Sequence, residues 1–301
     1  MKILRIFLTA ILSFSFTINC AAQTSGEKNA AKANKSGSQT KIRERKPPEN
    51  APDEASIIRT IAEGTDASVT TPFVFVARTP DAFARLENLV KISPTKNIDF
   101  KRTAIVAVFA GTKNTGGYSP NVTGNTRKIS VRIISPPKDA MVTQSITTPY
   151  KIVSIDVKPE DGLNLDLSAD FTNAAKNYRL TSSNFEISGG FAGVKKTFAA
   201  QGTVRVLNWG DYLTLVFDLT GKAGANKRKL SEIASGAITD GKINLPRIQA
   251  ADFIDRPHPF MTAAGNLSKN KLSLLFVPGE KDFAVSDGYA GGGNLAAVKI
   301  K

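Results

Sequence analysis

Three segments between Thr103 and Val157 constrain the fold more than any other part of the chain. The segment at 103–110 is a continuous run of β-branched and other apolar residues, which is typical of a strand buried on both faces. The segments at 128–134 and 150–157 alternate between apolar and polar residues, as half-buried strands do. We therefore predict a largely antiparallel sheet in this region.

A strand and a helix are expected just before this sheet. Phe73 to Ala77 is apolar and follows a Thr-Pro pair that favours the start of a strand. Thr79 and Pro80 then supply a helix cap and a proline at the first helical position. Apolar residues follow at helical spacing, which predicts an amphipathic helix over 80–92 (Phe83, Leu86, Leu89 and Val90).

The second half of the chain also has a β-rich pattern, and Pro159 to Gly162 is a natural turn before it. Leu230, Ile233, Ala234 and Ile238 fall on one face at helical spacing, so a short helix is expected over 229–238. Residues 296–300 fit either a strand or a helix. Strands are expected at 163–169, 177–187, 194–208, 212–219 and 272–277. The predicted fold class is α+β, mostly antiparallel β, with two small β-rich domains at 55–158 and 159–301.

The N-terminus has the features of an export signal. Lys2 and Arg5 precede an uncharged apolar stretch, and Cys20 follows it at once. We expect a signal peptide over 1–19 and lipidation of Cys20, which is the chain's one cysteine and so has no intramolecular disulfide partner. Asn19 departs from the small residue usual before a lipidated cysteine, so cleavage after Ala22 is the alternative, giving a soluble secreted protein. The expected location is the cell envelope, with a lipid anchor in the outer membrane or at the cell surface.

Residues 20–54 contain almost no core-forming side chains and are expected to form a flexible tether. The chain carries a formal net charge of +14, from 40 basic and 26 acidic residues. These basic residues are spread along the sequence, and the tightest cluster, Lys227 to Lys229, is short. A solvated basic surface is therefore favoured over a nucleic-acid interface.

Four short motifs follow the strand at 103–110 in order: Gly111-Thr112, Gly116-Gly117-Tyr118, Pro136-Pro137 and Thr148-Pro149-Tyr150. Together with the predicted elements of about 70–157, they resemble the C-terminal domain of the protease complex subunit PrcB family. Members of this family are bacterial cell-surface lipoproteins linked to protease complexes. The resemblance implies a protease or protease-complex subunit as the partner.

A second and shorter motif lies in Phe185 to Val194. Its Gly-Gly-Phe-Ala-Gly core resembles the signature of the emfourin-like family, and emfourin inhibits a thermolysin-type metalloprotease. This resemblance adds four candidate binding residues, namely Gly189, Gly190, Phe191 and Gly193. The candidates from the first loop are Gly111, Thr112, Gly116, Gly117 and Tyr118, with Tyr118 and Phe191 as aromatic anchors.

Catalytic and metal-binding patterns are weak by comparison. Gly111 to Gly116 has the spacing of a phosphate loop, but the lysine and hydroxyl residues that should follow are replaced by Gly117 and Tyr118. His258 is the one histidine, so no two-histidine or cysteine–histidine metal site is expected. Carboxylates that a hydrolase would need are present at turns (Asp252, Asp255, Asp282 and Asp287). We expect no catalytic residues, no metal and no cofactor.

The sequence thus predicts a non-catalytic lipoprotein of the cell envelope that binds or stabilises a protease or protease complex. One alternative is direct inhibition of a thermolysin-type metalloprotease by the region 159–301. Another is a surface-adhesion or cell-wall-binding module that uses the basic charge excess. An enzyme with paired carboxylates is the least favoured.

Overall fold

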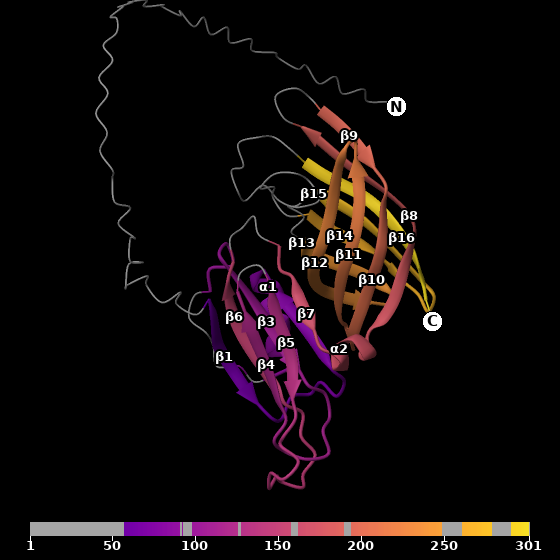
Figure 1. Cartoon of the computed structure of the whole chain (residues 1–301). Coiled ribbons are helices and arrows are strands. Elements are labelled where there is room, and N and C mark those ends of the chain that lie inside the picture. The colour runs from indigo at the N-terminus through magenta and orange to yellow at the C-terminus, as the bar shows by residue number, and fades with distance from the viewer. Residues whose placement is uncertain are drawn as a thin grey trace, which may run out of the picture. The chain divides into compact units, whose positions relative to one another are not determined.

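The computed structural model describes residues 57–90, 92, 98–125, 128–157, 162–189, 194–248, 261–278 and 290–300. The expected signal peptide, Cys20 and the tether lie outside the described residues, as do His258 and the four turn carboxylates. Within the described part, strands dominate and only two short helices occur (Figure 1). The predicted α+β class, mostly antiparallel β, is confirmed.

The first sheet is antiparallel and has four strands in the order β1-β6-β3-β2. Strands β2 and β3 are buried along almost their whole length, as expected for continuous apolar runs. Strand β6 pairs with β3 over seven residues, from Thr103 opposite Asp156 to Phe109 opposite Tyr150. The four strands are β1 (Ile58–Gly64), β2 (Phe73–Ala77), β3 (Thr103–Phe109) and β6 (Tyr150–Asp156).

Helix α1 (Pro80–Glu87) begins as the sequence predicts. The hydroxyl of Thr79 accepts a hydrogen bond of 3.2 Å from the backbone N–H of Ala82, which satisfies one free donor of the first turn. The helix ends earlier than the predicted residue 92. Leu89 and Val90 are nevertheless buried in the first core. The spacing of apolar residues therefore predicted which residues are buried but predicted a helix that is too long.

A second, three-stranded sheet joins β4 (Ser119–Gly124), β5 (Ile129–Ile134) and β7 (Leu165–Leu167). The pairing of β5 with β7 is parallel, and a short helix, α2 (Ala169–Ala174), follows β7. Residues of β7 and α2 are buried in the first core. The first core therefore includes chain beyond residue 158.

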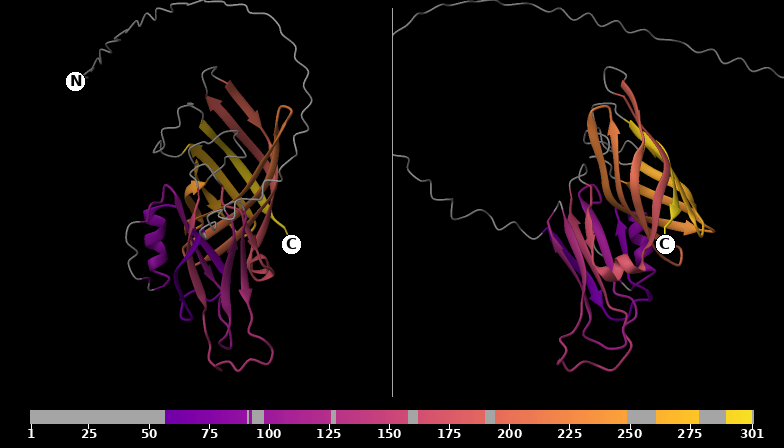
Figure 2. Two further views of the ribbon diagram at one scale, coloured as in Figure 1. Left: turned by 60° about the vertical axis from the view of Figure 1, so that its left-hand side comes forward. Right: turned by 45° about the vertical axis from the view of Figure 1, so that its right-hand side comes forward.

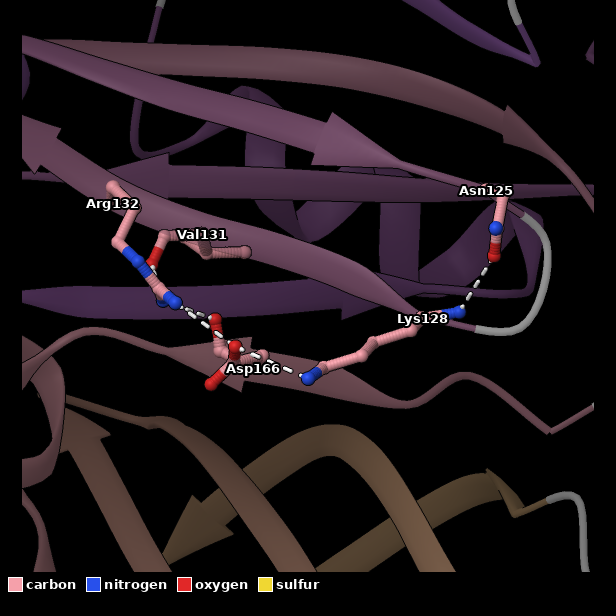
Figure 3. Close-up of polar contacts among 5 residues, drawn as sticks. All are labelled: Asn125, Lys128, Val131, Arg132 and Asp166. Atoms are coloured by element: carbon pink, nitrogen blue, oxygen red, sulfur yellow. Dashed lines mark hydrogen bonds and ion pairs between the residues drawn. The ribbon is translucent and has the colours of Figure 1, made fainter.

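A charged side chain ties β7 to this sheet. Arg132 of β5 donates from Nη2 to Oδ2 of Asp166 at 2.9 Å and from Nη1 to the Asp166 carbonyl at 2.7 Å (Figure 3). Lys128 approaches the same carboxylate at 3.5 Å. The Arg132 hydrogen bond, supported by the two cationic side chains, holds the pKa of Asp166 below its ordinary value.

Eight further strands close into an antiparallel barrel. Each pairs with its neighbour in sequence, and the closure comes from β8, which pairs with both β10 and β16. Strand β9 (Val194–Phe198) extends β8 as a hairpin, visible near the top of Figures 1 and 2. The barrel strands are β8 (Lys176–Gly189), β10 (Ala200–Trp209), β11 (Tyr212–Ala223), β12 (Asn226–Thr239), β13 (Lys242–Ile248), β14 (Met261–Leu267), β15 (Lys271–Pro278) and β16 (Ala290–Lys299).

The barrel interior is filled by side chains of the barrel strands and of β9. Phe276 lies 5.5 Å from Phe185 and 6.0 Å from Phe217 between ring centroids, and Phe198 stacks on Phe185 at 5.7 Å. From Lys271 to Val277 of β15 the burial alternates, with Leu272, Leu274 and Phe276 inside. A barrel of eight strands is just wide enough for side chains to fill it, and this one is packed in that way.

The predicted helix over 229–238 is wrong, because these residues belong to strand β12. Leu230 and Ala234 face the barrel interior, whereas Ile233 belongs to the first core. A strand that is buried on both faces carries apolar residues at several spacings, including those of a helix. The spacing of apolar residues therefore fits both a strand and a helix. Pairing with β11 and β13 makes this segment a strand.

The two cores meet at the outer face of β11 and β12. The hydroxyl of Thr214 donates to the carbonyl of Val74 at 2.6 Å, and the hydroxyl of Ser235 accepts from the N–H of Val76 at 2.8 Å. Both hydroxyls are buried and lie 2.7 Å apart. These contacts satisfy backbone groups of β2 with side chains of the barrel, as buried polar groups require.

Candidate functional site

The candidate loop 111–118 begins where the buried strand β3 ends. Gly111 has a φ of +71°, and a Cβ at this position would lie 2.8 Å from backbone atoms of Thr71 and Pro72. Only glycine suits a left-handed backbone pressed against another segment. The N–H of Thr112 then donates to the carbonyl of Thr70 at 2.9 Å, which fixes the start of the loop.

A second segment, 143–147, holds the middle of the loop in place. Lys113 and Thr147 exchange backbone hydrogen bonds of 2.8 and 2.9 Å, and the N–H of Gly116 donates to the carbonyl of Thr143 at 2.9 Å. The hydroxyl of Thr147 also donates to the carbonyl of Thr115 at 3.1 Å. The candidate loop therefore has a defined conformation in the absence of a partner, which reduces the entropic cost of ordering it on binding.

The aromatic residue of the loop is held in a partly exposed position. Tyr118 is half-buried, and the ammonium group of Lys113 lies 5.1 Å from the centre of its ring. Gly117 before it has a φ of +83°, and a Cβ there would come within 2.9 Å of Pro136 and Val142. The Gly-Gly-Tyr and Pro-Pro motifs thus pack closely against each other.

Three exposed apolar side chains lie next to this loop. Ile134 is 49% exposed, Met141 102% and Ile146 75%, so these residues contribute nothing to either core. Ile134 pairs with Ser119 beside Tyr118, and the hydrogen bonds of Thr143 and Thr147 tie the chain around Met141 and Ile146 to the loop. We call Tyr118, Ile134, Met141 and Ile146 the tip surface. Figures 1 and 2 show its magenta loops extending beyond the ends of β4 and β5.

The tip surface falls inside a segment that matches a known family. Residues 104–156 match the family model described as PrcB C-terminal. This segment is a PrcB C-terminal domain. No match was found among curated proteins or among solved structures.

The Thr-Pro-Tyr motif at 148–150 stabilises the interior of the PrcB C-terminal domain. The hydroxyl of Thr148 donates to the carbonyl of Ala67 at 2.6 Å, and the ring of Tyr150 packs where Gly64 has no side chain. Burial, with a smaller contribution from the charge of Asp66, raises the pKa of the Tyr150 hydroxyl. This part of the sequence signature is structural, because it anchors the base of the candidate loop.

Met141 and Ile146 were not among the residues selected from the sequence. They lie in the polar stretch between Pro137 and Pro149, where no period of two or 3.6 residues gives them a buried face. Apolar residues outside any periodic pattern are the signal that could have identified them. Together with Tyr118 and Ile134, they form the tip surface of the PrcB C-terminal domain.

The second candidate loop is described only in part. Gly189 ends β8 and pairs with Val194 at the end of the β8–β9 hairpin. Gly190, Phe191 and Gly193 lie outside the described residues. Among the contacts that the structure describes, none joins Gly189 to the loop 111–118, so the two candidate loops are treated separately.

Metal and membrane features can be stated for the described residues alone. These residues contain no cluster of three or more histidine, cysteine, aspartate or glutamate side chains with the geometry of a metal site. Among the same residues, neither helix has the length and apolar character needed to span a bilayer.

Proposed function

We propose that the chain is a non-catalytic protein of the cell envelope, anchored through a lipid on Cys20, that binds a protease or protease complex through the tip surface. The observation that carries the proposal is the exposure of Met141 and Ile146 beside Tyr118 in a PrcB C-terminal domain. Exposed apolar groups on a conformationally fixed loop are typical of protein interfaces. The resemblance of this domain to a protease-complex subunit supplies the kind of partner.

The conformation of the tip surface supports the same proposal. Its loops are braced by backbone hydrogen bonds at Lys113, Gly116 and Thr147, so binding would order few additional residues. Tyr118 has a large ring and a polar hydroxyl, which suits the centre of an interface. Lys113 beside the ring adds a positive charge that would favour an acidic rim on the partner.

The proposal is tested by a pull-down from an extract of the source organism's envelope, read by mass spectrometry. The wild-type chain is compared with a Met141→Ser/Ile146→Ser variant, which removes apolar groups from the tip surface alone. A matched control is Leu275→Ser/Val277→Ser, since these two side chains are 55% and 43% exposed on the barrel wall. We expect a protease to be recovered by the wild type and by the control and to be strongly reduced with the tip variant.

A further variant, Tyr118→Ala, separates binding from folding. It should weaken recovery of the protease while leaving the melting curve near that of the wild type. Recovery of no protease, or equal recovery by all variants, would refute the proposed role. Adding the purified chain to the recovered protease then distinguishes an accessory subunit, which preserves or raises activity, from a direct inhibitor, which lowers activity in proportion to dose.

A further inference from the structure

A hollow of about 670 Å³ lies at the end of the barrel formed by the β11–β12 hairpin. Its lining comes from 199–201, 220–222 and Lys227. Strand β10 pairs with β11 only as far as Ala200 opposite Gly221, and the described pairing of β9 is with β8. Strands β10 and β11 are therefore no longer paired beyond Ala200 and Gly221, and the hollow lies where these two strands separate. Pockets for small ligands commonly have volumes of this order.

Two lysines face each other at the rim of this hollow. Lys222 and Lys227 are direct cross-strand partners in the β11–β12 ladder, and both are exposed. Arg228 and Lys229 continue the basic run on β12. Like charges placed directly opposite in an antiparallel pair destabilise it. The hairpin therefore carries a local repulsion that an anion between the two ammonium groups would relieve.

The sequence of the hairpin between Leu219 and Ser231 contains neither aspartate nor glutamate. Among the ion pairs and hydrogen bonds described for residues 194–248, none involves the ammonium group of Lys222 or Lys227. The arrangement contrasts with Lys128 and Lys151, which each lie within 3.5 Å of a carboxylate. Neither ammonium group is therefore paired with a carboxylate within the described part of the chain.

We propose that this hollow binds a phosphate-bearing organic ligand, with its phosphate between the ammonium groups of Lys222 and Lys227. Lysine recognises phosphate as a compact point charge with three donors. Gln201 and Thr220 are cross-strand partners in the lining and supply polar side chains for the rest of the ligand. The volume exceeds what a single phosphate fills, which favours a phosphate joined to a polyol or sugar. This site is separate from the tip surface and does not depend on the proposed function.

The test titrates the full chain with glycerol 3-phosphate by isothermal calorimetry at low salt. The Lys222→Gln/Lys227→Gln variant is compared with Lys242→Gln/Lys271→Gln, which changes the net charge equally at exposed positions beyond the other end of β12. We expect the first variant to weaken binding about tenfold or more and the control to bind like the wild type. Binding by the wild type should also weaken as sodium chloride is raised.

The phosphate could come from a free metabolite or from a lipid headgroup, and flotation with vesicles distinguishes them. Vesicles of phosphatidylglycerol present the same glycerol phosphate on a surface, and phosphatidylcholine vesicles serve as the control. Lysine-dependent binding of glycerol 3-phosphate without flotation indicates a free ligand, and lysine-dependent flotation with phosphatidylglycerol indicates a headgroup. The proposal is overturned if the wild type binds neither probe, or if both double variants bind the probes equally well.

Discussion

Arg78 and Glu232 form a buried ion pair, with Nη2 of the arginine 3.3 Å from Oε1 of the glutamate. The side chains are only 6% and 1% exposed. The other carboxylate oxygen accepts a hydrogen bond of 2.8 Å from the backbone N–H of Leu163. Since Arg78 follows β2 and Glu232 lies in β12, this carboxylate holds the first core against the barrel.

A second guanidinium joins the same cluster. Nη1 of Arg247 donates to the carbonyl of Arg78 at 3.3 Å and to that of Phe100 at 3.1 Å. Burial, and then the charge of Arg78, lowers the pKa of Arg247 to about 10, although Glu232 acts in the opposite direction. The charge of Glu232 therefore acts on both buried guanidinium groups.

The first prediction concerns this buried cluster. Glu232→Gln should lower the free energy of unfolding by about 3–5 kcal/mol, because it removes the charge that pairs with Arg78 and acts on Arg247. Urea denaturation measures the change. The control is Glu63→Gln, which removes an exposed pair with Lys151 at 2.9 Å and should cost about 1 kcal/mol or less. Equal losses in the two variants would show that the buried cluster does not join the two cores.

A second prediction uses the alternation of β15. Leu274 is 2% exposed and faces the barrel interior, whereas its neighbour Leu275 is 55% exposed. Leu274→Ala should cost about 2–5 kcal/mol, because it leaves a cavity among well-packed rings. Leu275→Ala should change the free energy of unfolding by about 0.5 kcal/mol at most. The same denaturation experiment tests both variants, and a reversed order would mean that the register of β15 is wrong.

Much of the first sheet could be predicted from the sequence, for physical reasons. Strand β3 is a continuous apolar run, and α1 has a threonine cap and a proline at its start, so local chemistry specifies both. Strand β12 could not be assigned in the same way, because it is buried on both faces and its spacing also fits a helix. Closure of the barrel depends on the pairing of β8 with β10 and β16, which no local pattern specifies.

The position of the candidate loop could be predicted from the sequence, because turn chemistry is local. Gly111 and Gly117 have positive φ values, which glycine accommodates readily. The exposed Met141 and Ile146 were missed, because exposure is set by what the rest of the fold leaves uncovered. The parallel pairing of β5 with β7 was missed for a similar reason, since it joins segments far apart in sequence.

The third prediction concerns Gly111. Gly111→Ala should cost about 2 kcal/mol or more, because the new Cβ meets a left-handed φ and also the backbone of Thr71 and Pro72. Gly210→Ala is the matched control. That glycine also has a positive φ, +52°, but no heavy atom lies within 4 Å of a Cβ there. We expect about 1 kcal/mol from backbone strain alone, so equal costs would contradict the close packing at Gly111.

The fourth prediction concerns the pH dependence of the Arg132–Asp166 pair. The pKa of Asp166 is lowered in the folded protein from its ordinary 3.8, chiefly by the Arg132 hydrogen bond. A depressed carboxylate pKa means that the unfolded state binds more protons in acid. The stabilisation is therefore complete above about pH 4 and is lost as the pH falls through the folded-state pKa of Asp166.

Asp166→Asn should thus be less stable than the wild type at neutral pH, and the difference should shrink as the pH falls below 3.8. Urea denaturation between neutral pH and pH 2.5 measures it. Asp139→Asn, at an exposed position for which the described residues show no ion pair, should follow the wild-type curve throughout. A stability difference between Asp166→Asn and the wild type that stays constant with pH would mean that the effect of the substitution is steric. A difference caused by the lost charge of Asp166 should instead shrink as Asp166 becomes protonated in the wild type.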